Sequence, residues 1–268
     1  MNERVEELKA KIKARIKKDK ELLAQLDPVQ EMQIERYTDL EKRVALKPKV
    51  PRYETGLEWF DRHTGGIEAG TFINLAGQAF GGKTTMVLKI LANISEYKET
   101  VLFSFEMYEN KLVKRLQHLN DTQKHNLLIV QTQYKIEEID AIVRKKAKDG
   151  VKFFAIDSRM KVQISIDGKE YQKIAYLSNH LSKLCQELGI IIILINQISE
   201  DNLKTGRLSL KGSGDQSYDS DMMLYIIVKK EKDGEEKRLC ICDKDRDGGK
   251  KWVEDITEPN VVVREYQE

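Results

Sequence analysis

The sequence has little of what marks a secreted, metal-binding or membrane-spanning chain. It holds three cysteines and four histidines in 268 residues, and neither set has the spacing of zinc ligands. An odd, sparse cysteine count is typical of a reducing compartment, so we expect a cytoplasmic protein. The longest apolar run, 190–195, is far shorter than the roughly 20 residues that cross a bilayer, and the chain is charged from its third residue. We therefore expect no membrane segment and no secretory signal.

Net charge is also nearly absent. The chain has 46 Lys and Arg against 44 Asp and Glu, which gives a formal charge of +2. A globally basic nucleic-acid binder is therefore excluded, and any contact with phosphates must come from local patches. With 40% hydrophobic and 34% charged residues, the composition is that of a folded protein and not of a disordered one.

The most specific pattern that is present lies between residues 77 and 85. It has a glycine, four further residues and then Gly-Lys-Thr, and it stands between an apolar run expected to be a strand (71–76) and an apolar-periodic run expected to be a helix (84–94). Backbone N–H groups of such a loop cradle phosphates, while the lysine reaches the β- and γ-phosphates and the threonine hydroxyl binds Mg²⁺. The expected phosphate-binding residues are Gly77, Gln78, Ala79, Phe80, Gly81, Gly82, Lys83, Thr84 and Thr85. The pattern predicts a P-loop nucleotide triphosphatase; a plain glycine-rich turn is the alternative.

The first fifty residues differ from the rest. Residues 1–26 have apolar positions mostly three and four apart, which predicts an amphipathic helix, and a second helical pattern reaches Val44. The segment 47–51 contains two prolines and predicts an extended linker. We expect residues 1–50 to form a helical extension that can serve as an oligomerisation element, and 51–268 to form the main domain. The basic run 11–20 could touch phosphates, although a solvated helix face is favoured.

Beyond the linker, apolar runs alternate with helical patterns, which predicts an α/β fold with a mostly parallel central sheet. The last runs flank a turn at 232–235 and predict an antiparallel edge. The expected strands are 71–76, 100–105, 127–131, 152–156, 190–195, 222–228, 237–242, 252–256 and 261–264.

Three polar side chains stand at the carboxyl ends of expected strands, where a triphosphatase needs its chemistry. Asp157 follows the run 153–156 and is the candidate Mg²⁺ carboxylate; a turn aspartate is the alternative. Glu106 follows the run 101–105 and is the candidate to polarise water, unless it only begins a helix expected over 109–119. Gln197 follows the run 190–195 and is the candidate sensor of the γ-phosphate, or else a simple strand cap.

Residues 53–249 resemble the RecA-like motor domain of the DnaB-type replicative hexameric helicases, within the KaiC and RecA superfamily. The motifs occur in the family's order. They are Thr64-Gly65-Gly66 before the P-loop, Phe103-Ser104-Phe105-Glu106-Met107 with Leu112-Val113-Lys114-Arg115, Leu194-Ile195-Asn196-Gln197-Ile198, the stretch 213–221, and Asp243-Lys244-Asp245-Arg246-Asp247-Gly248.

The resemblance implies a RecA-like P-loop core, ATP and Mg²⁺ as nucleotide and metal, and single-stranded DNA and further copies of the chain as partners, in a hexameric ring or a helical filament. It gives Lys244 and Arg246 the role of reaching the γ-phosphate bound by the adjacent subunit; surface ion pairs are the alternative. It also places DNA-gripping loops at 159–169 and 199–211, with Lys204, Arg207 and Lys211 in the second.

The leading interpretation is an ATP-hydrolysing oligomeric motor, a compact DnaB-like helicase that translocates on single-stranded DNA. One alternative is a KaiC- or recombinase-like ATPase that binds DNA or protein without unwinding. A second is a non-enzymatic loader that uses ATP only to assemble. The complete P-loop, the Asp157 carboxylate and the Glu106 carboxylate argue against the second alternative.

Overall fold

The structure is a computed structural model that describes residues 15, 35–198, 219–230 and 234–257. The chain divides into two compact units, Met1–Lys49 and Val50–Glu268. In the first, helix α2 (Tyr37–Ala45) buries none of its residues. Apart from residue 15, the helix expected over 1–26 lies outside the described residues, and so does the strand expected over 261–264. None of the described helices has the length and apolar character needed to cross a membrane.

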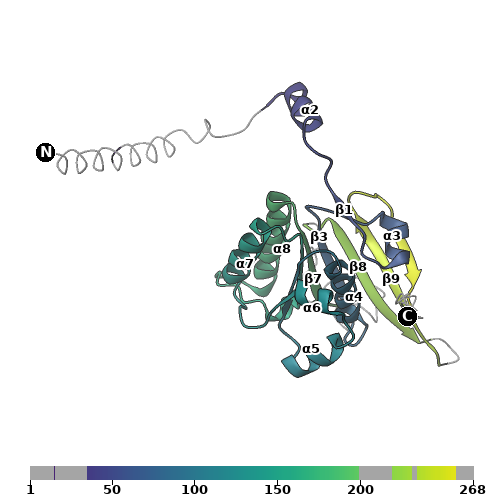
Figure 1. Ribbon diagram of the computed structural model, residues 1–268. Coiled ribbons are helices and arrows are strands. Elements are labelled where there is room, and N and C mark those ends of the chain that lie inside the picture. The colour runs from purple at the N-terminus through teal and green to yellow at the C-terminus, as the bar shows by residue number, and fades with distance from the viewer. Residues whose placement is uncertain (1–14, 16–34, 199–218, 231–233, 258–268) are drawn as a thin grey trace. The chain divides into compact units, whose positions relative to one another are not determined.

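The second unit is built on an eight-stranded sheet with the order β10-β9-β8-β3-β7-β6-β4-β5. Its strands are β3 (Phe72–Gly77), β4 (Thr100–Ser104), β5 (Leu127–Val130), β6 (Phe153–Asp157), β7 (Ile191–Gln197), β8 (Met222–Lys230), β9 (Glu236–Asp245) and β10 (Trp252–Asp255). The strands from β8 to β5 pair in parallel, and β9 and β10 pair antiparallel at one edge. The expected parallel core with an antiparallel C-terminal edge is confirmed (Figure 1).

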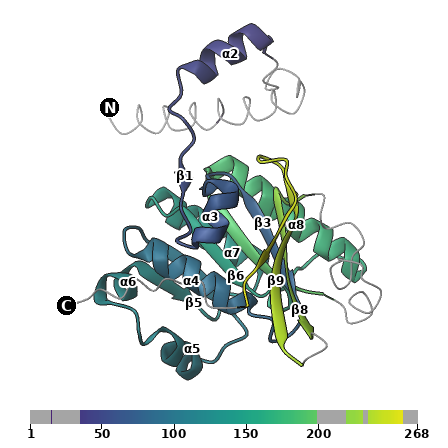
Figure 2. The same cartoon turned by 90° about the vertical axis from the view of Figure 1, so that its right-hand side faces the viewer.

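Helices cover both faces of this sheet (Figures 1 and 2). One core takes buried residues from α3 (Glu58–Thr64), α4 (Lys83–Ser95) and α5 (Glu109–Leu116), with α6 (Asp121–Asn126) beside α4; the other takes them from α7 (Ile136–Lys148) and α8 (Glu170–Leu188). Alternate residues of β7 enter alternate cores: Ile191 and Ile193 lie in the first, Ile192 and Leu194 in the second. The run 190–195 is continuously apolar because both of its faces are covered.

Smaller elements were not expected. Strands β1 (Arg52–Tyr53) and β2 (Ile67–Glu68) form a separate two-stranded antiparallel sheet. A single turn of 3₁₀-helix, η1 (Arg159–Lys161), follows β6. The helix expected over 109–119 ends at Leu116, because Asn120 then caps the separate helix α6 through a reciprocal hydrogen-bond pair with Gln123.

The parallel strands all end on the same side of the sheet, along the line formed by their carboxyl ends. We call this line the P-loop edge. Gly77 of β3 lies level with Gln197 of β7, and Ser104 of β4 lies level with Asp157 of β6. The opposite edge holds the start of β8 and the end of β9, where Met222 pairs with Asp245. We call it the finger edge, since it carries Lys244 and Arg246, which are expected to act as an arginine finger, a cationic group that reaches the γ-phosphate bound by the adjacent subunit.

Candidate functional site

The P-loop connects the end of β3 to the start of α4. Gly77 is enclosed, because a Cβ atom there would lie 2.6 Å from the backbone oxygen of Ile226 on β8. Gly82 begins the helix with a φ of 104°, which side-chain-bearing residues rarely adopt. Phe80 has a φ of 60° and a fully exposed side chain. Glycine is therefore required where the loop leaves the sheet and where it enters the helix.

Lys83 is buried at the first turn of α4, and its ammonium group points back into the loop. The Nζ atom donates to the backbone oxygen of Gly77 at 3.0 Å and to that of Gln78 at 2.7 Å. Burial lowers the pKa of Lys83, while the charges of Glu106 and Asp157 act in the opposite direction. The ammonium group thus bonds to the loop and lies near enough to Glu106 and Asp157 for their charges to act on it.

Asp157 is the last residue of β6 and is 3% exposed. Its Oδ2 accepts a hydrogen bond of 2.8 Å from the hydroxyl of Thr84, while Oδ1 has no hydrogen-bond partner among the described residues. Burial raises the pKa of Asp157 to about 6; the hydrogen bond from Thr84 acts against this rise, and the charge of Glu106 adds to it. A buried carboxylate with an unsatisfied oxygen beside a threonine hydroxyl suits a hard cation such as Mg²⁺.

The described residues contain no group of three or more His, Cys, Asp and Glu side chains that could enclose a metal. Thr84 and Asp157 would therefore supply only part of the coordination of Mg²⁺. That fits an ion held by one or two protein ligands together with water and phosphate oxygens, as in many nucleotide sites.

Glu106 follows β4 directly and is exposed to solvent. The hydroxyl of Ser158 donates a hydrogen bond to its Oε1. The backbone N–H of Phe105 donates to the backbone oxygen of Asp157 at 2.7 Å, so the ends of β4 and β6 are joined. The structure thus brings Glu106 next to Asp157 and anchors one of its carboxylate oxygens. Ser158 was missed, because its role depends on which strand lies beside β6.

Gln197 ends β7 and pairs in register with Gly77. The N–H of the next residue, Ile198, donates to the backbone oxygen of Gly77 at 3.2 Å. Asn196 is fully buried and donates to the side chain of Asn74 at 2.6 Å, which joins β7 to β3 inside the core. Of the two amides, Gln197 is the half-buried one at the P-loop edge and Asn196 holds the sheet together.

Lys244 and Arg246 lie at the finger edge and not beside the P-loop of their own chain. On β8, Met222 pairs with Asp245 of β9, and Ile226, four residues further along, is level with Gly77 of β3. Four residues of a strand rise about 13 Å, and β9 lies two strand spacings, about 10 Å, to the side of β3. These two distances separate Asp245 from the start of the P-loop. Arg246 lies beyond Asp245, so its side chain cannot reach the P-loop of the same chain.

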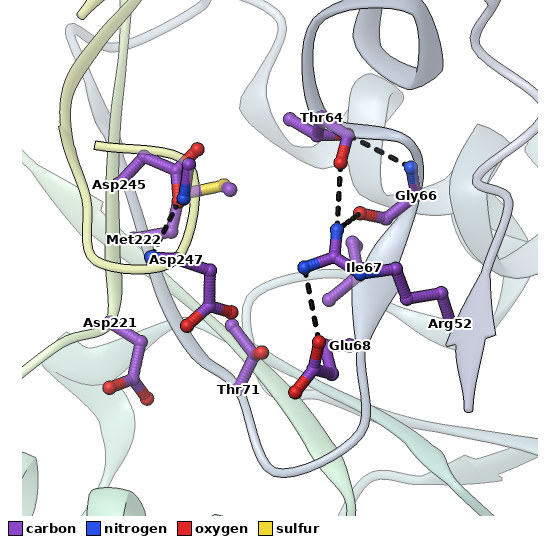
Figure 3. A pocket seen from close by; sticks show the side chains of 11 residues that line it. Arg52, Thr64, Gly66, Ile67, Glu68, Thr71, Asp221, Met222, Asp245 and Asp247 are labelled. Atoms are coloured by element: carbon purple, nitrogen blue, oxygen red, sulfur yellow. Dashed lines mark hydrogen bonds and ion pairs between the residues drawn. The ribbon is translucent and has the colours of Figure 1, made fainter. Parts of the chain in front are cut away.

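The finger edge is rich in carboxylates. A pocket of about 300 Å³, open solvent included, is lined by Asp221, Asp245, Asp247, Arg52 and further residues of the β1–β2 sheet and its surroundings (Figure 3). Arg52 donates to the backbone oxygen of Thr64 at 2.8 Å and pairs with Glu68 at 3.1 Å. Burial lowers the pKa of Lys244, and the nearby charge of Arg246 lowers it further, so the two cations lie close together.

The candidate DNA-binding residues Lys204, Arg207 and Lys211 lie outside the described residues. In the other expected loop, 159–169, the chain begins with η1 and then pairs Gln163 with Lys135 in an isolated bridge. Arg159 of this loop is buried at 6% exposure and forms an ion pair with Glu170 at 3.5 Å.

Comparison with known proteins agrees with this geometry. The family model of the DnaB-like helicase C terminal domain matches residues 53–121 and 116–260. The replicative DNA helicase DnaB of Buchnera aphidicola is 24% identical over an alignment of 210 residues that covers 64% of this chain and 45% of that protein. The DNA repair protein RadA of Salmonella typhimurium is 22% identical over 160 residues, 59% of this chain and 34% of that protein.

Among solved structures, that of a DnaB-like replicative helicase superposes with a TM-score of 0.66 at 20% identity, over 81% of this chain and 62% of that one. A KaiC-like protein of Pyrococcus horikoshii superposes with a TM-score of 0.62, also at 20% identity, over 77% of this chain and 94% of that one. These likenesses show a shared RecA-like ATPase fold.

The extent of the matches differs between the comparisons. The chain spans less than half the length of the curated relatives given above. The family model, in contrast, matches most of the residues from Tyr53 onward. On that match, the chain belongs to the DnaB-like helicase C terminal domain family.

Proposed function

We propose that this protein is an ATP-hydrolysing, oligomeric DNA motor, a compact DnaB-like helicase that translocates on single-stranded DNA in the cytoplasm. Family membership supports the class of protein. The arrangement of the site supports the chemistry: the P-loop, Asp157 and Glu106 meet at one edge of the sheet, and two cations lie at the other.

The proposed roles at the P-loop edge follow from the contacts. Backbone N–H groups of 77–85 and the start of α4 hold the phosphates. Lys83, which donates hydrogen bonds to backbone oxygens of the loop in this structure, donates to phosphate oxygens instead when ATP is bound. A Mg²⁺ ion held by Thr84 and Asp157 would neutralise charge that develops on the phosphates. Glu106, anchored by Ser158, orients and polarises the attacking water.

Gln197 is the proposed sensor of the γ-phosphate. It follows the buried strand β7, is level with the first P-loop residue, and leads directly into the segment 199–211. A side chain that contacts the γ-phosphate from this position can pass the nucleotide state to that segment. Lys204, Arg207 and Lys211 in the segment are the proposed contacts to DNA phosphates.

The observation that carries the proposal is the separation of the two halves of the site. Lys244 and Arg246 cannot reach the P-loop of their own chain, because they lie at the opposite edge of the sheet. If these two cations add to the charge that Lys83 and Mg²⁺ supply, they must do so in the site of a neighbouring copy. Sites shared between subunits require a ring or a filament.

The N-terminal unit is the proposed oligomerisation element, and residues 51–268 are the proposed motor domain. On α2, Tyr37, Leu40 and Val44 follow helical spacing on one side, and their exposed fractions are 74%, 36% and 53%. Because none of the residues of α2 is buried, its apolar stripe suits a helix that docks on another copy.

The test mixes two variants that fail for different reasons. Arg246→Ala is expected to bind ATP and lose about 10³-fold or more in turnover, and Glu106→Gln is expected to bind ATP without turning over. In a mixed assembly, a normal P-loop edge can meet a normal finger edge, so activity should return. If no ATPase activity returns on mixing, the proposal of shared sites is contradicted.

Lys83→Ala must abolish turnover, and normal hydrolysis by that variant would refute the ATPase assignment.

A KaiC- or recombinase-like ATPase remains the second candidate, because RadA is among the relatives. Both candidates share the site described above, so they differ only in whether ATP hydrolysis drives the separation of DNA strands. A strand-displacement assay beside an ATPase assay stimulated by single-stranded DNA separates them: displacement supports the helicase, and stimulated hydrolysis without displacement supports the alternative.

A further inference from the structure

Asp221 stands between the arginine of the finger edge and the strand that carries the P-loop. It is a buried residue directly before β8, with 8% of its surface exposed. Its Oδ1 accepts a hydrogen bond of 2.6 Å from a terminal nitrogen of Arg246, whose side chain is 48% exposed. The backbone N–H of Arg246 also donates to the backbone oxygen of Asp221 at 2.9 Å.

The other side of Asp221 is fixed to the first residue of β3. Its Oδ2 accepts the backbone N–H of Phe72 at 2.9 Å, and its own N–H donates to the backbone oxygen of Phe72 at 2.9 Å. Phe72 is fully buried, so these bonds are shielded from water. One carboxylate therefore joins Arg246 to the strand whose far end, Gly77, begins the P-loop.

A half-exposed arginine has many rotamers, and an arginine that must reach a phosphate across an interface is most effective when few of them are populated. Charge-assisted hydrogen bonds to a buried carboxylate restrict the guanidinium strongly. Arginine has five N–H donors, so one guanidinium can bind a carboxylate and a phosphate at the same time.

We propose that Asp221 is the positioning residue of the arginine finger: it holds the Arg246 guanidinium at the finger edge and fixes it to the start of β3. The inference rests on the proposed function, in which Arg246 acts in the site of the neighbouring copy. It also means that the strand bearing one chain's P-loop anchors the group that serves the next chain's nucleotide.

The substitution Asp221→Asn removes the ion pair with little change in shape. An asparagine has only one side-chain oxygen, and the buried N–H of Phe72 needs that acceptor. The amide nitrogen would then face the guanidinium, where donor meets donor. We expect unchanged ATP binding, because the P-loop is intact, and a loss of about 10²-fold in turnover from the displaced finger.

Mixing decides whether the loss arises through Arg246. If Asp221 acts on the finger, Asp221→Asn mixed with Glu106→Gln should regain activity, since each chain supplies what the other lacks. If Asp221 acts only by holding β3 and its own P-loop, mixing restores nothing, and the inference is overturned. When Arg246→Ala is rescued by Glu106→Gln but Asp221→Asn is not, the proposed function survives and the role of Asp221 falls; when neither is rescued, the shared site itself is wrong.

A matched control is available on β10. Glu254 also holds an arginine, Arg62, at 2.9 Å, so Glu254→Gln makes the same chemical change in an ion pair that does not involve the finger. It should leave turnover unchanged.

Should Asp221→Asn fail to bind ATP, Asp221→Glu keeps the charge on a longer side chain and enters the same mixing test. As a further check, Asp221→Asn should cost nothing more in an Arg246→Ala background; an equal additional loss there would also overturn the inference.

Discussion

At the scale of single residues, the site combines groups that are costly for the protein to bury. The pKa of Asp157 is raised from 3.8 to about 6, and burial is the largest cause of this rise. A carboxyl group whose pKa is higher in the folded state takes up its proton more readily when folded. Its ionised form therefore costs stability above about pH 6, and this cost falls as the pH drops through 6 towards 3.8.

Replacing Asp157 with asparagine should stabilise the metal-free protein at neutral pH. The change removes the buried charge, although the new amide N–H group also needs a partner, so we expect a gain of about 1–2 kcal/mol. Thermal unfolding in a chelator at about pH 7.5 measures it, and the gain should shrink below about pH 6 because wild-type Asp157 is then protonated. Asp243→Asn, which removes a partly exposed carboxylate paired with Lys251, is the control and should give no gain. A destabilised Asp157→Asn protein would contradict this account.

Ser158 gives a second prediction at this scale. Its hydroxyl is buried and donates to Glu106, which is itself exposed. Ser158→Ala should lower turnover about 10-fold, the equivalent of one hydrogen bond, and leave ATP affinity unchanged. Steady-state ATPase rates beside nucleotide titrations measure the two effects. Ser178→Ala removes another buried serine hydroxyl, on α8, and should change neither quantity. Equal turnover in both variants would remove Ser158 from the mechanism.

At the scale of elements, apolar runs were the reliable signal. The core strands could be predicted because their residues are buried on both faces, and the observed ends differ from the expected ones by at most three residues. The β1–β2 sheet was missed because two-residue strands have no periodicity. Helix α6 was missed because it begins at a capping pair within a polar stretch and not at an apolar run.

The candidate site was predictable only where a motif is local. The P-loop, Glu106 and Asp157 each stand at the end of an apolar run, so the sequence alone singles them out as candidates. Asp221 and Ser158 act through partners on other elements, 25 and 52 residues away in the chain. Their roles depend on strand order and register, which no local pattern contains. The positions of Lys204, Arg207 and Lys211 stay a prediction.

Gly77 links the strand to the loop, and a side chain there should disturb both. Gly77→Ala would place Cβ 2.6 Å from the rigid backbone oxygen of Ile226. We expect a loss of about 1–3 kcal/mol in stability and weaker ATP binding, because β3 and β8 must separate. The control is Gly150→Ala, which has a φ of +99° but meets nothing within 4 Å; it should lose stability from strain and keep ATP binding. Normal nucleotide affinity in Gly77→Ala would show that the loop tolerates the shift.

At the scale of the whole molecule, the two edges of the sheet hold the two halves of the proposed shared site. Each copy presents phosphate-binding and water-activating groups at the P-loop edge and Lys244 and Arg246 at the finger edge. If copies share sites as proposed, the association is heterologous: the edges differ, so copies would join head to tail and either close into a ring or continue as a filament. Turnover per chain should then rise with protein concentration.

The apolar stripe of α2 gives this assembly its sharpest test. Leu40→Glu places a charge between Tyr37 and Val44 on the proposed docking face, so the assembled fraction should fall at low protein concentration and return at high concentration. Thr38→Glu adds the same side chain elsewhere on the helix and should assemble as the wild type does. Mass measurement with ATP and single-stranded DNA follows assembly, and ATPase activity per chain should change in parallel. If Leu40→Glu assembles normally, the two edges of the motor domain suffice to hold neighbouring copies together, and residues 1–50 serve another purpose.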